Sequence, residues 1–151
     1  MRDIHPQLVD YIRSRGKVYT PAIPPERVVR GKVGDCFDAS AYNAARRGFR
    51  YVEGIAEDPR QRGTWVLHAW ITDDGKHAYD PTWKMMIGDE EHPLNTLYIG
   101  IEMPIEIVAR FMVKTGYKSI LANAWRDPEL AQQAAPGVPI IKGQDENDDK
   151  K

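Results

Sequence analysis

Residues 64–82 read TWVLHAWITDDGKHAYDPT, which has the pattern of a β-hairpin. Residues 64–72 are rich in β-branched and aromatic side chains and predict one strand. Residues 73–75, Asp-Asp-Gly, are turn formers, and 76–80 then predict the partner strand. We therefore expect two antiparallel strands joined by a short turn.

The register of this hairpin decides which side chains meet. With a three-residue loop and Gly75 in the left-handed conformation, residues whose numbers add up to 148 face each other, so His68 lies opposite Asp80. Cross-strand neighbours have Cβ atoms about 4.5–5.5 Å apart, which a carboxylate-to-imidazole hydrogen bond can bridge. The same alternation puts His77 on the other face. His68 is therefore the predicted partner of Asp80.

The one cysteine of the chain, Cys36, stands at the predicted start of a helix. Asp35 is in the N-cap position, and Gly48 can supply the left-handed residue after a helix that runs to about Arg47. The first backbone N–H groups and the positive end of the helix dipole favour a thiolate there. A lone cysteine excludes an intramolecular disulfide, so this thiol is either a buried packing group or a reactive one. Its own backbone N–H could donate to an oxyanion, with Tyr19 as a weaker second candidate.

Helical and strand patterns flank this region on both sides. Apolar residues at helical spacing predict a first helix that ends at Gly16, and prolines make the segment 19–34 an extended lead-in to the cysteine helix. The other predicted elements are strands at 49–56 and within 94–102, a helix with Pro104 as its first residue, and a short helix that starts at 127–128.

The composition is that of one globular domain, because the 151 residues are 42% hydrophobic and 28% charged. We expect the domain to cover residues 1–142, with 143–151 a charged tail too poor in apolar surface to order itself. No apolar run approaches the roughly 18 residues of a spanning helix, and the first residues lack a signal-peptide core, so a cytoplasmic protein without membrane contact is expected. The net charge of −1 gives no global field that would recruit nucleic acid.

Four groups of residues, taken in chain order, resemble a known family. They are Gly34-Asp35-Cys36; then Ala39, Arg47, Gly48, Val52 and Gly54; then His68-Ala69-Trp70; and then Asp80-Pro81-Thr82. This order is similar to the transglutaminase-like core of the papain-like cysteine-enzyme superfamily. The glycine directly after Arg47 and the short loop between the histidine and aspartate strands depart from that pattern. The resemblance implies an α+β fold in which a cysteine-bearing helix packs on an antiparallel sheet, with Cys36 as nucleophile, His68 as general acid and base, and Asp80 as orienter.

These residues favour acyl transfer on an amide. A Cys36 thiolate would attack the carbonyl of a peptide or protein amide, His68 would protonate the departing amine, and water or a small amine would resolve the thioester. Tyr19, Trp70 and Trp83 are candidate substrate-binding residues, and core packing explains the two tryptophans equally well. The small size and the absence of a calcium-loop pattern favour a peptidase, an amidase or a small amide transferase over a large regulated crosslinking enzyme.

Two other hypotheses account for the same residues. The chain could be a catalytically idle binding module that grips a peptide or a partner protein, in which case replacing Cys36 would leave the biological effect intact. Thiolate, imidazole and carboxylate are also three zinc ligands with an open fourth position. A cysteine at a helix start beside a pair of strands fits a thiol triad better than a metal centre, so we expect neither a metal nor a cofactor.

Overall fold

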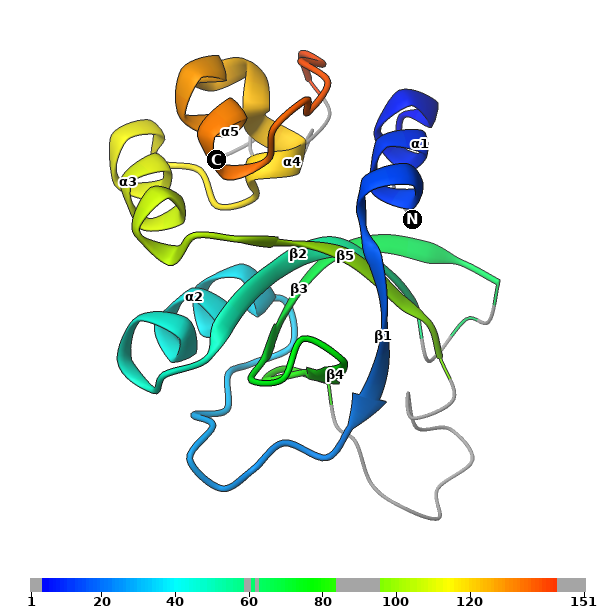
Figure 1. Cartoon of the computed structure of the whole chain (residues 1–151), viewed down its shortest axis with the longest axis vertical. Helices are drawn as coiled ribbons and strands as arrows, with labels where there is room; N and C mark the ends of the chain where they lie inside the picture. Colours follow the sequence, from blue (N-terminus) through cyan, green and yellow to red (C-terminus); the bar gives the residue numbers. More distant parts are fainter. Residues whose placement is uncertain (1–3, 59–60, 62, 84–95, 144–151) are drawn as a thin grey trace.

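A computed structural model describes residues 4–58, 61, 63–83 and 96–143 of the chain. Its helices and strands are α1 (Pro6–Arg15), β1 (Lys17–Ala22), α2 (Cys36–Arg46), β2 (Arg50–Glu57), β3 (Trp65–Thr72), β4 (His77–Tyr79), β5 (Tyr98–Met103), α3 (Ile105–Thr115), α4 (Ile120–Asn123), the 3₁₀ helix η2 (Ala124–Arg126) and α5 (Pro128–Ala134). Helices lie above a small sheet and at its left in Figure 1, and this mixture of helices and strands confirms the predicted α+β class.

Within the described residues, the strands close into a barrel in the order β1-β4-β3-β2-β5, so the expectation of an antiparallel sheet was wrong. The ring is completed by β1, which pairs antiparallel with β5 and parallel with β4. Tyr19 faces Tyr98 in the first pair, and Thr20 faces His77 in the second. The start of the predicted lead-in is therefore a strand. A strand that joins both edges satisfies the backbone groups that an open sheet leaves unpaired.

Two glycines allow close packing inside this small barrel. Gly54 and Gly100 face each other in β2 and β5. A Cβ at Gly54 would lie 2.0 Å from the carbonyl oxygen of Ile99, and a Cβ at Gly100 would lie 2.6 Å from the ring of Trp70. Any side chain at either position would push backbone or the indole ring aside, so both positions require glycine.

The β3–β4 hairpin differs from its predicted register. Ile71 faces Tyr79, a register shifted by two residues from the expected one, so direct opposition of His68 and Asp80 was wrong. The turn is longer than three residues, because β3 ends at residue 72 and β4 begins only at His77. Side chains alternate with a period of two, so a shift of two residues keeps His68 and Asp80 on one face, in diagonal positions.

The helix α2 begins at Cys36, as predicted, and packs against β2 and β3. Asp35 is its N-cap residue, but the Asp35 side chain makes no cap hydrogen bond, so that part of the prediction was wrong. Gly48, with φ +78°, takes the predicted left-handed conformation just after the helix. The buried Asn43 side chain donates to the Val29 carbonyl at 2.9 Å and accepts from the Val29 N–H at 2.7 Å. These bonds hold the segment before Cys36 against its own helix.

The remaining helices cover the sheet, with α1, α3 and α5 above β2 and β5 in Figure 1 and β4 below them. Pro104 is the N-cap of α3 rather than its first residue, which corrects the prediction. Asp127 precedes Pro128 at the start of α5, as expected, and its side chain accepts from the Leu130 N–H at 3.1 Å. None of the helices in the described ranges is both long enough and apolar enough to cross a membrane. The predicted tail from residue 144 onward lies outside the described residues.

Candidate active site

His68 and Asp80 form a buried pair. His68 lies on β3 and Asp80 directly follows β4, and His68 Nε2 is 2.6 Å from Asp80 Oδ2. The two residues are 3% and 0% exposed. Their side chains span the diagonal between the two strands, which is the contact that the shared face made possible. The structure therefore brings together the two residues that the hairpin pattern predicted as partners.

Further hydrogen bonds fix the Asp80 carboxylate. Its Oδ1 accepts from the Thr82 N–H at 3.0 Å, the Thr82 hydroxyl at 3.1 Å and the Trp83 N–H at 2.9 Å, while Oδ2 also accepts from the Tyr98 hydroxyl at 2.8 Å. The three bonds to Oδ1 are local, because an aspartate readily bonds to groups two and three residues further along. Burial alone would raise the pKa of Asp80, but the charge of His68 and these hydrogen bonds outweigh burial and lower that pKa.

The surroundings of His68 favour its positively charged form. Burial disfavours the imidazolium, but the charges of Asp80 and Cys36, together with hydrogen bonds to both side chains, raise the pKa of His68 to about 10. Since Nε2 is bonded to Asp80, Nδ1 is the ring nitrogen that is left for the Cys36 thiol. Asp80 therefore bonds to one side of the His68 ring, and Cys36 is close enough to act on the same imidazole.

Cys36 is the first residue of α2 and is 6% exposed. At this position the thiol lies at the positive end of the helix dipole, beside the backbone N–H groups of the first turn. The exposed Asp35 carboxylate does not cap these groups. They remain available to an anion that forms at the sulfur, which is the environment that thiol chemistry needs.

Trp83 covers the imidazole. The two rings are nearly parallel, with their centroids 3.8 Å and their planes 18° apart. The Trp83 residue is only 9% exposed, and its backbone N–H is bonded to Asp80. An indole face favours a cation lying against it, so Trp83 supports the charged form of His68. The predicted contact of Trp83 with a substrate stays a prediction.

Tyr19 and Trp70 lie in the barrel interior rather than at its surface. Both are 0% exposed, and their rings meet edge to face with centroids 5.7 Å apart. In the described part of the chain, the Tyr19 hydroxyl and the Trp70 Nε1 have no hydrogen-bond partner. Burial, with a smaller effect of the Glu102 charge, raises the pKa of Tyr19 to about 12, so its hydroxyl stays protonated. Neither side chain is exposed to a ligand in this structure. The substrate-binding roles of Tyr19 and Trp70 stay predictions.

Sequence reasoning missed Tyr98, whose hydroxyl bonds to Asp80. The only signal was the strand pattern within 94–102, because β5 reaches the Asp80 turn through closure of the barrel, which no local pattern encodes. His77, by contrast, behaves as predicted and stays outside the pair. Its exposed ring is bonded to Asp74, with Nδ1 2.5 Å from Oδ2.

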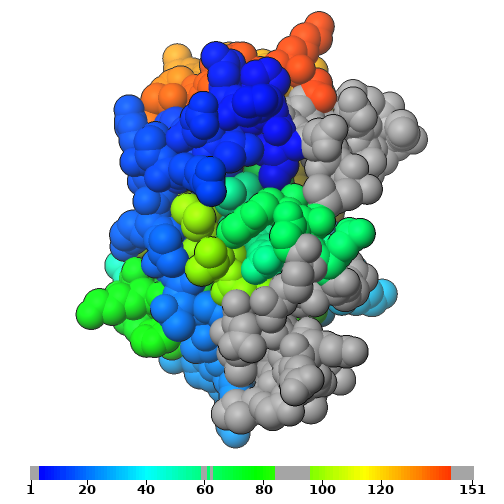
Figure 2. Space-filling model, turned by 90° about the vertical axis from the view of Figure 1, so that its right-hand side faces the viewer, coloured from blue at the N-terminus to red at the C-terminus, as the bar shows by residue number. Residues whose placement is uncertain are grey.

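A hollow of about 680 Å³ lies between α1 and the start of β3, and Cys36, His68 and Asp80 are not among its lining residues. Its lining residues are Ile4, Pro6, Val9, Arg13, Ile55, Gly63, Thr64 and Trp65. Figure 2 shows this face, with α1 in blue above the green residues of the β2–β3 region. Among the residues that the structure describes, no three histidines, cysteines or acidic residues are placed to hold a metal ion.

The fold and the site together define an α+β protein in which a closed barrel holds a buried histidine–aspartate pair beside a cysteine at a helix start. Comparisons with protein-family models, with curated proteins and with solved structures each gave no match to this chain.

Proposed function

We propose that this protein is a cytoplasmic thiol enzyme of the transglutaminase-like type, which transfers the acyl group of an amide through Cys36, His68 and Asp80. The observation that carries the proposal is the buried 2.6 Å bond from Asp80 to His68, with Cys36 on the same imidazole. A charged imidazole favours a neighbouring thiolate, and a carboxylate on its far nitrogen fixes the ring orientation. A packing cysteine would need neither.

The first half of the reaction forms a thioester. The Cys36 sulfur bonds to the amide carbonyl carbon, and the π electron pair of the C=O bond moves onto the oxygen. The Cys36 N–H, in the first turn of α2, would donate to that oxyanion. The C=O bond then re-forms, the C–N bond breaks, and His68 Nδ1 gives its proton to the departing nitrogen, which leaves as an amine. The products are an acylated Cys36 and a neutral His68.

The second half restores the enzyme. Water or a primary amine attacks the thioester carbon while His68 Nδ1 takes its proton, and the C–S bond breaks. Attack by water yields a carboxylic acid, and attack by an amine yields a new amide. In both cases the cysteine leaves as a thiolate beside a protonated His68. Asp80 keeps its charge throughout and stabilises the imidazolium at both ends of the cycle.

The first test needs no substrate. At about pH 6, where an ordinary thiol is almost wholly protonated, Cys36 should react with iodoacetamide faster than glutathione does. His68→Gln and Asp80→Asn should each slow that reaction by about tenfold or more, since one unit of pKa corresponds to a tenfold change. Circular dichroism of both variants checks that they fold. A wild-type rate equal to that of glutathione, unchanged in both variants, would rule out thiol catalysis by this site.

The second test identifies the acyl group. Wild-type protein is incubated with peptides that carry side-chain and terminal amides, and intact-mass spectrometry looks for an acyl adduct on Cys36. The adduct should be absent in Cys36→Ala, and added methylamine should divert the product from acid to methylamide if the acceptor is an amine. Peptide binding that survives Cys36→Ala, with no adduct in the wild type, would instead favour a binding module.

A further inference from the structure

The Asp80 oxygen that holds His68 is shared with a second donor. Oδ2 accepts from His68 Nε2 at 2.6 Å and from the Tyr98 hydroxyl at 2.8 Å. The two donors come from different strands, β3 and β5, and their rings lie 6.2 Å apart, centroid to centroid. Burial, followed by the charge of Asp80, raises the pKa of Tyr98 well above its ordinary value. Its hydroxyl is therefore a neutral donor at any pH at which the site operates.

The ring of Tyr98 is held rigidly behind this bond. Tyr98 is 0% exposed and meets Trp70 edge to face, with centroids 5.0 Å and planes 84° apart. It also meets Trp83, whose ring covers His68, at 6.2 Å and 63°. Both rings restrict the tyrosine in the barrel interior. The direction from which its hydroxyl approaches Asp80 is therefore fixed by packing rather than by the hydrogen bond itself.

We propose that Tyr98 is a positioning residue of the acyl-transfer site: its hydroxyl fixes the Asp80 oxygen that bonds to His68 and takes up part of that oxygen's charge. The assignment rests on the proposed function, because it concerns the orientation of the catalytic imidazole. Tyr98 acts through Asp80 and does not touch the reacting atoms. Its effect is to set how strongly the carboxylate binds the imidazolium.

Loss of the Tyr98 hydroxyl should change the pKa of His68 in one definite direction. With one donor removed, Oδ2 concentrates its charge on His68 Nε2, and the protonated imidazole is bound more tightly. The charges that act most strongly on His68 are those of Asp80 and Cys36. The Tyr98 hydroxyl acts through Asp80, and the Tyr98 ring, 6.2 Å from the imidazole, is kept in Tyr98→Phe. The pH at which His68 loses its proton should therefore rise in Tyr98→Phe. We expect the pKa of His68 to rise by about one unit, because that shift corresponds to the free-energy contribution of one hydrogen bond to a charged group.

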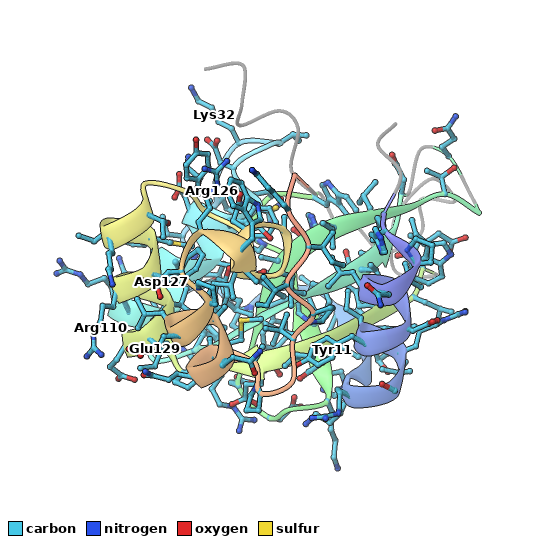
Figure 3. The ribbon with its side chains drawn as sticks, turned by 90° about the horizontal axis from the view of Figure 1, so that it is seen from above. Tyr11, Lys32, Arg110, Arg126, Asp127 and Glu129 are labelled. Carbon is cyan, nitrogen blue, oxygen red and sulfur yellow. The ribbon has the colours of Figure 1, made fainter. Side chains whose placement is uncertain are left out.

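The matched control is Tyr11→Phe. Tyr11 lies on α1 beside the segment that follows α5 (Figure 3), and its hydroxyl donates to the Pro136 carbonyl at 2.8 Å. Both substitutions thus remove one 2.8 Å hydrogen bond from a buried tyrosine and keep the ring. Selectively ¹³C-labelled histidine resolves the four imidazoles by NMR. His68 should titrate at higher pH in Tyr98→Phe and at the wild-type value in Tyr11→Phe, although both variants lose thermal stability.

A Tyr98→Phe variant that lowers the melting temperature but leaves the His68 titration unchanged would overturn the inference, because a merely structural tyrosine behaves in that way. A second measurement uses the wild type alone. The Tyr98 hydroxyl proton and the His68 Nε2 proton share one acceptor, so a nuclear Overhauser effect between them is expected, and its absence contradicts the assignment. Neither readout involves acyl transfer, so both hold or fail independently of the iodoacetamide test.

Discussion

Asp80 and Glu53 are two fully buried carboxylates with similar donors and opposite pKa shifts. Each accepts from a tyrosine hydroxyl, from a serine or threonine hydroxyl and from two backbone N–H groups. The donors to Glu53 are the Tyr51 hydroxyl at 2.7 Å, the Ser119 hydroxyl at 3.1 Å, and the N–H groups of Ile120 and Leu121, each at 3.0 Å. Asp80 has, in addition, the imidazole of His68.

The two carboxylates differ because Asp80 is bonded to a cation, the imidazolium of His68. Burial raises the pKa of Glu53 although its hydrogen bonds act in the opposite direction, so uncharged donors do not offset the loss of hydration. At Asp80 the imidazolium reverses the balance, and the pKa falls. Hydrogen bonds to Glu53 join β2 to the start of α4, whereas Asp80 keeps its charge beside His68. Similar donor sets therefore do not imply similar ionisation.

Replacing Asp80 should have the largest effect on this contrast. Asp80→Asn keeps the size of the side chain and removes the charge, so the pH at which His68 titrates should fall by about two units or more, the usual effect of a close opposite charge. The measurement is the NMR titration of the labelled histidines. Glu53→Gln is the control and should leave His68 unchanged, because no bond joins Glu53 to His68. If the pH at which His68 titrates fell by a similar amount in both variants, the cause would be a general loosening of the barrel structure and not the loss of the Asp80 charge.

The face of the hairpin could be predicted from the sequence, and its register could not. Side chains on a strand alternate between the two faces of the sheet, so the pattern placed His68 and Asp80 on the same face even though the loop was longer than expected. The start of α2 at Cys36 was equally local, since helix-start signals lie within a few residues. These local rules were enough to predict Cys36, His68 and Asp80 as one candidate site.

Contacts that depend on barrel closure could not be predicted. The strand β1 contains Pro21, which argues against a central strand, and its partner β4 is parallel and far along the chain. The bond from Tyr98 to Asp80 exists only because that closure brings β5 beside the turn after β4. Glu53 likewise sits in a strand pattern that gives no sign of burial, because the element that covers it, α4, lies more than sixty residues later.

The pH dependence of stability should have opposite signs for the two carboxylates. Glu53 has a raised pKa in the folded state, so the unfolded chain loses this proton first as the pH rises. Its contribution is fully present below the ordinary value of 4.5 and is lost as the pH rises through the raised folded value. Asp80 has a lowered pKa, so its contribution is present above its ordinary value of 3.8 and is lost as the pH falls through the folded value.

Urea unfolding at a series of pH values measures this difference. Relative to Glu53→Gln, the wild type should lose stability with rising pH above about 4.5, by about 1.4 kcal/mol for each unit by which the folded pKa is raised. Relative to Asp80→Asn, it should instead lose stability as the solution becomes more acidic. Parallel curves for the wild type and Glu53→Gln would mean that Glu53 ionises normally and that its donors do offset burial.

The smallest effect is expected at the second histidine–aspartate pair of the chain. His77 and Asp74 are as close as the buried pair, at 2.5 Å, but their side chains are 46% and 39% exposed. Water screens such a pair and competes for its hydrogen bonds, so His77→Ala should leave both the rate of Cys36 alkylation and the titration of His68 unchanged. Iodoacetamide kinetics and the NMR titration measure the two quantities. A slower Cys36 in His77→Ala would mean that a short histidine–carboxylate contact acts on the thiol without burial, and the comparison between Asp80 and Glu53 would then lose its physical basis.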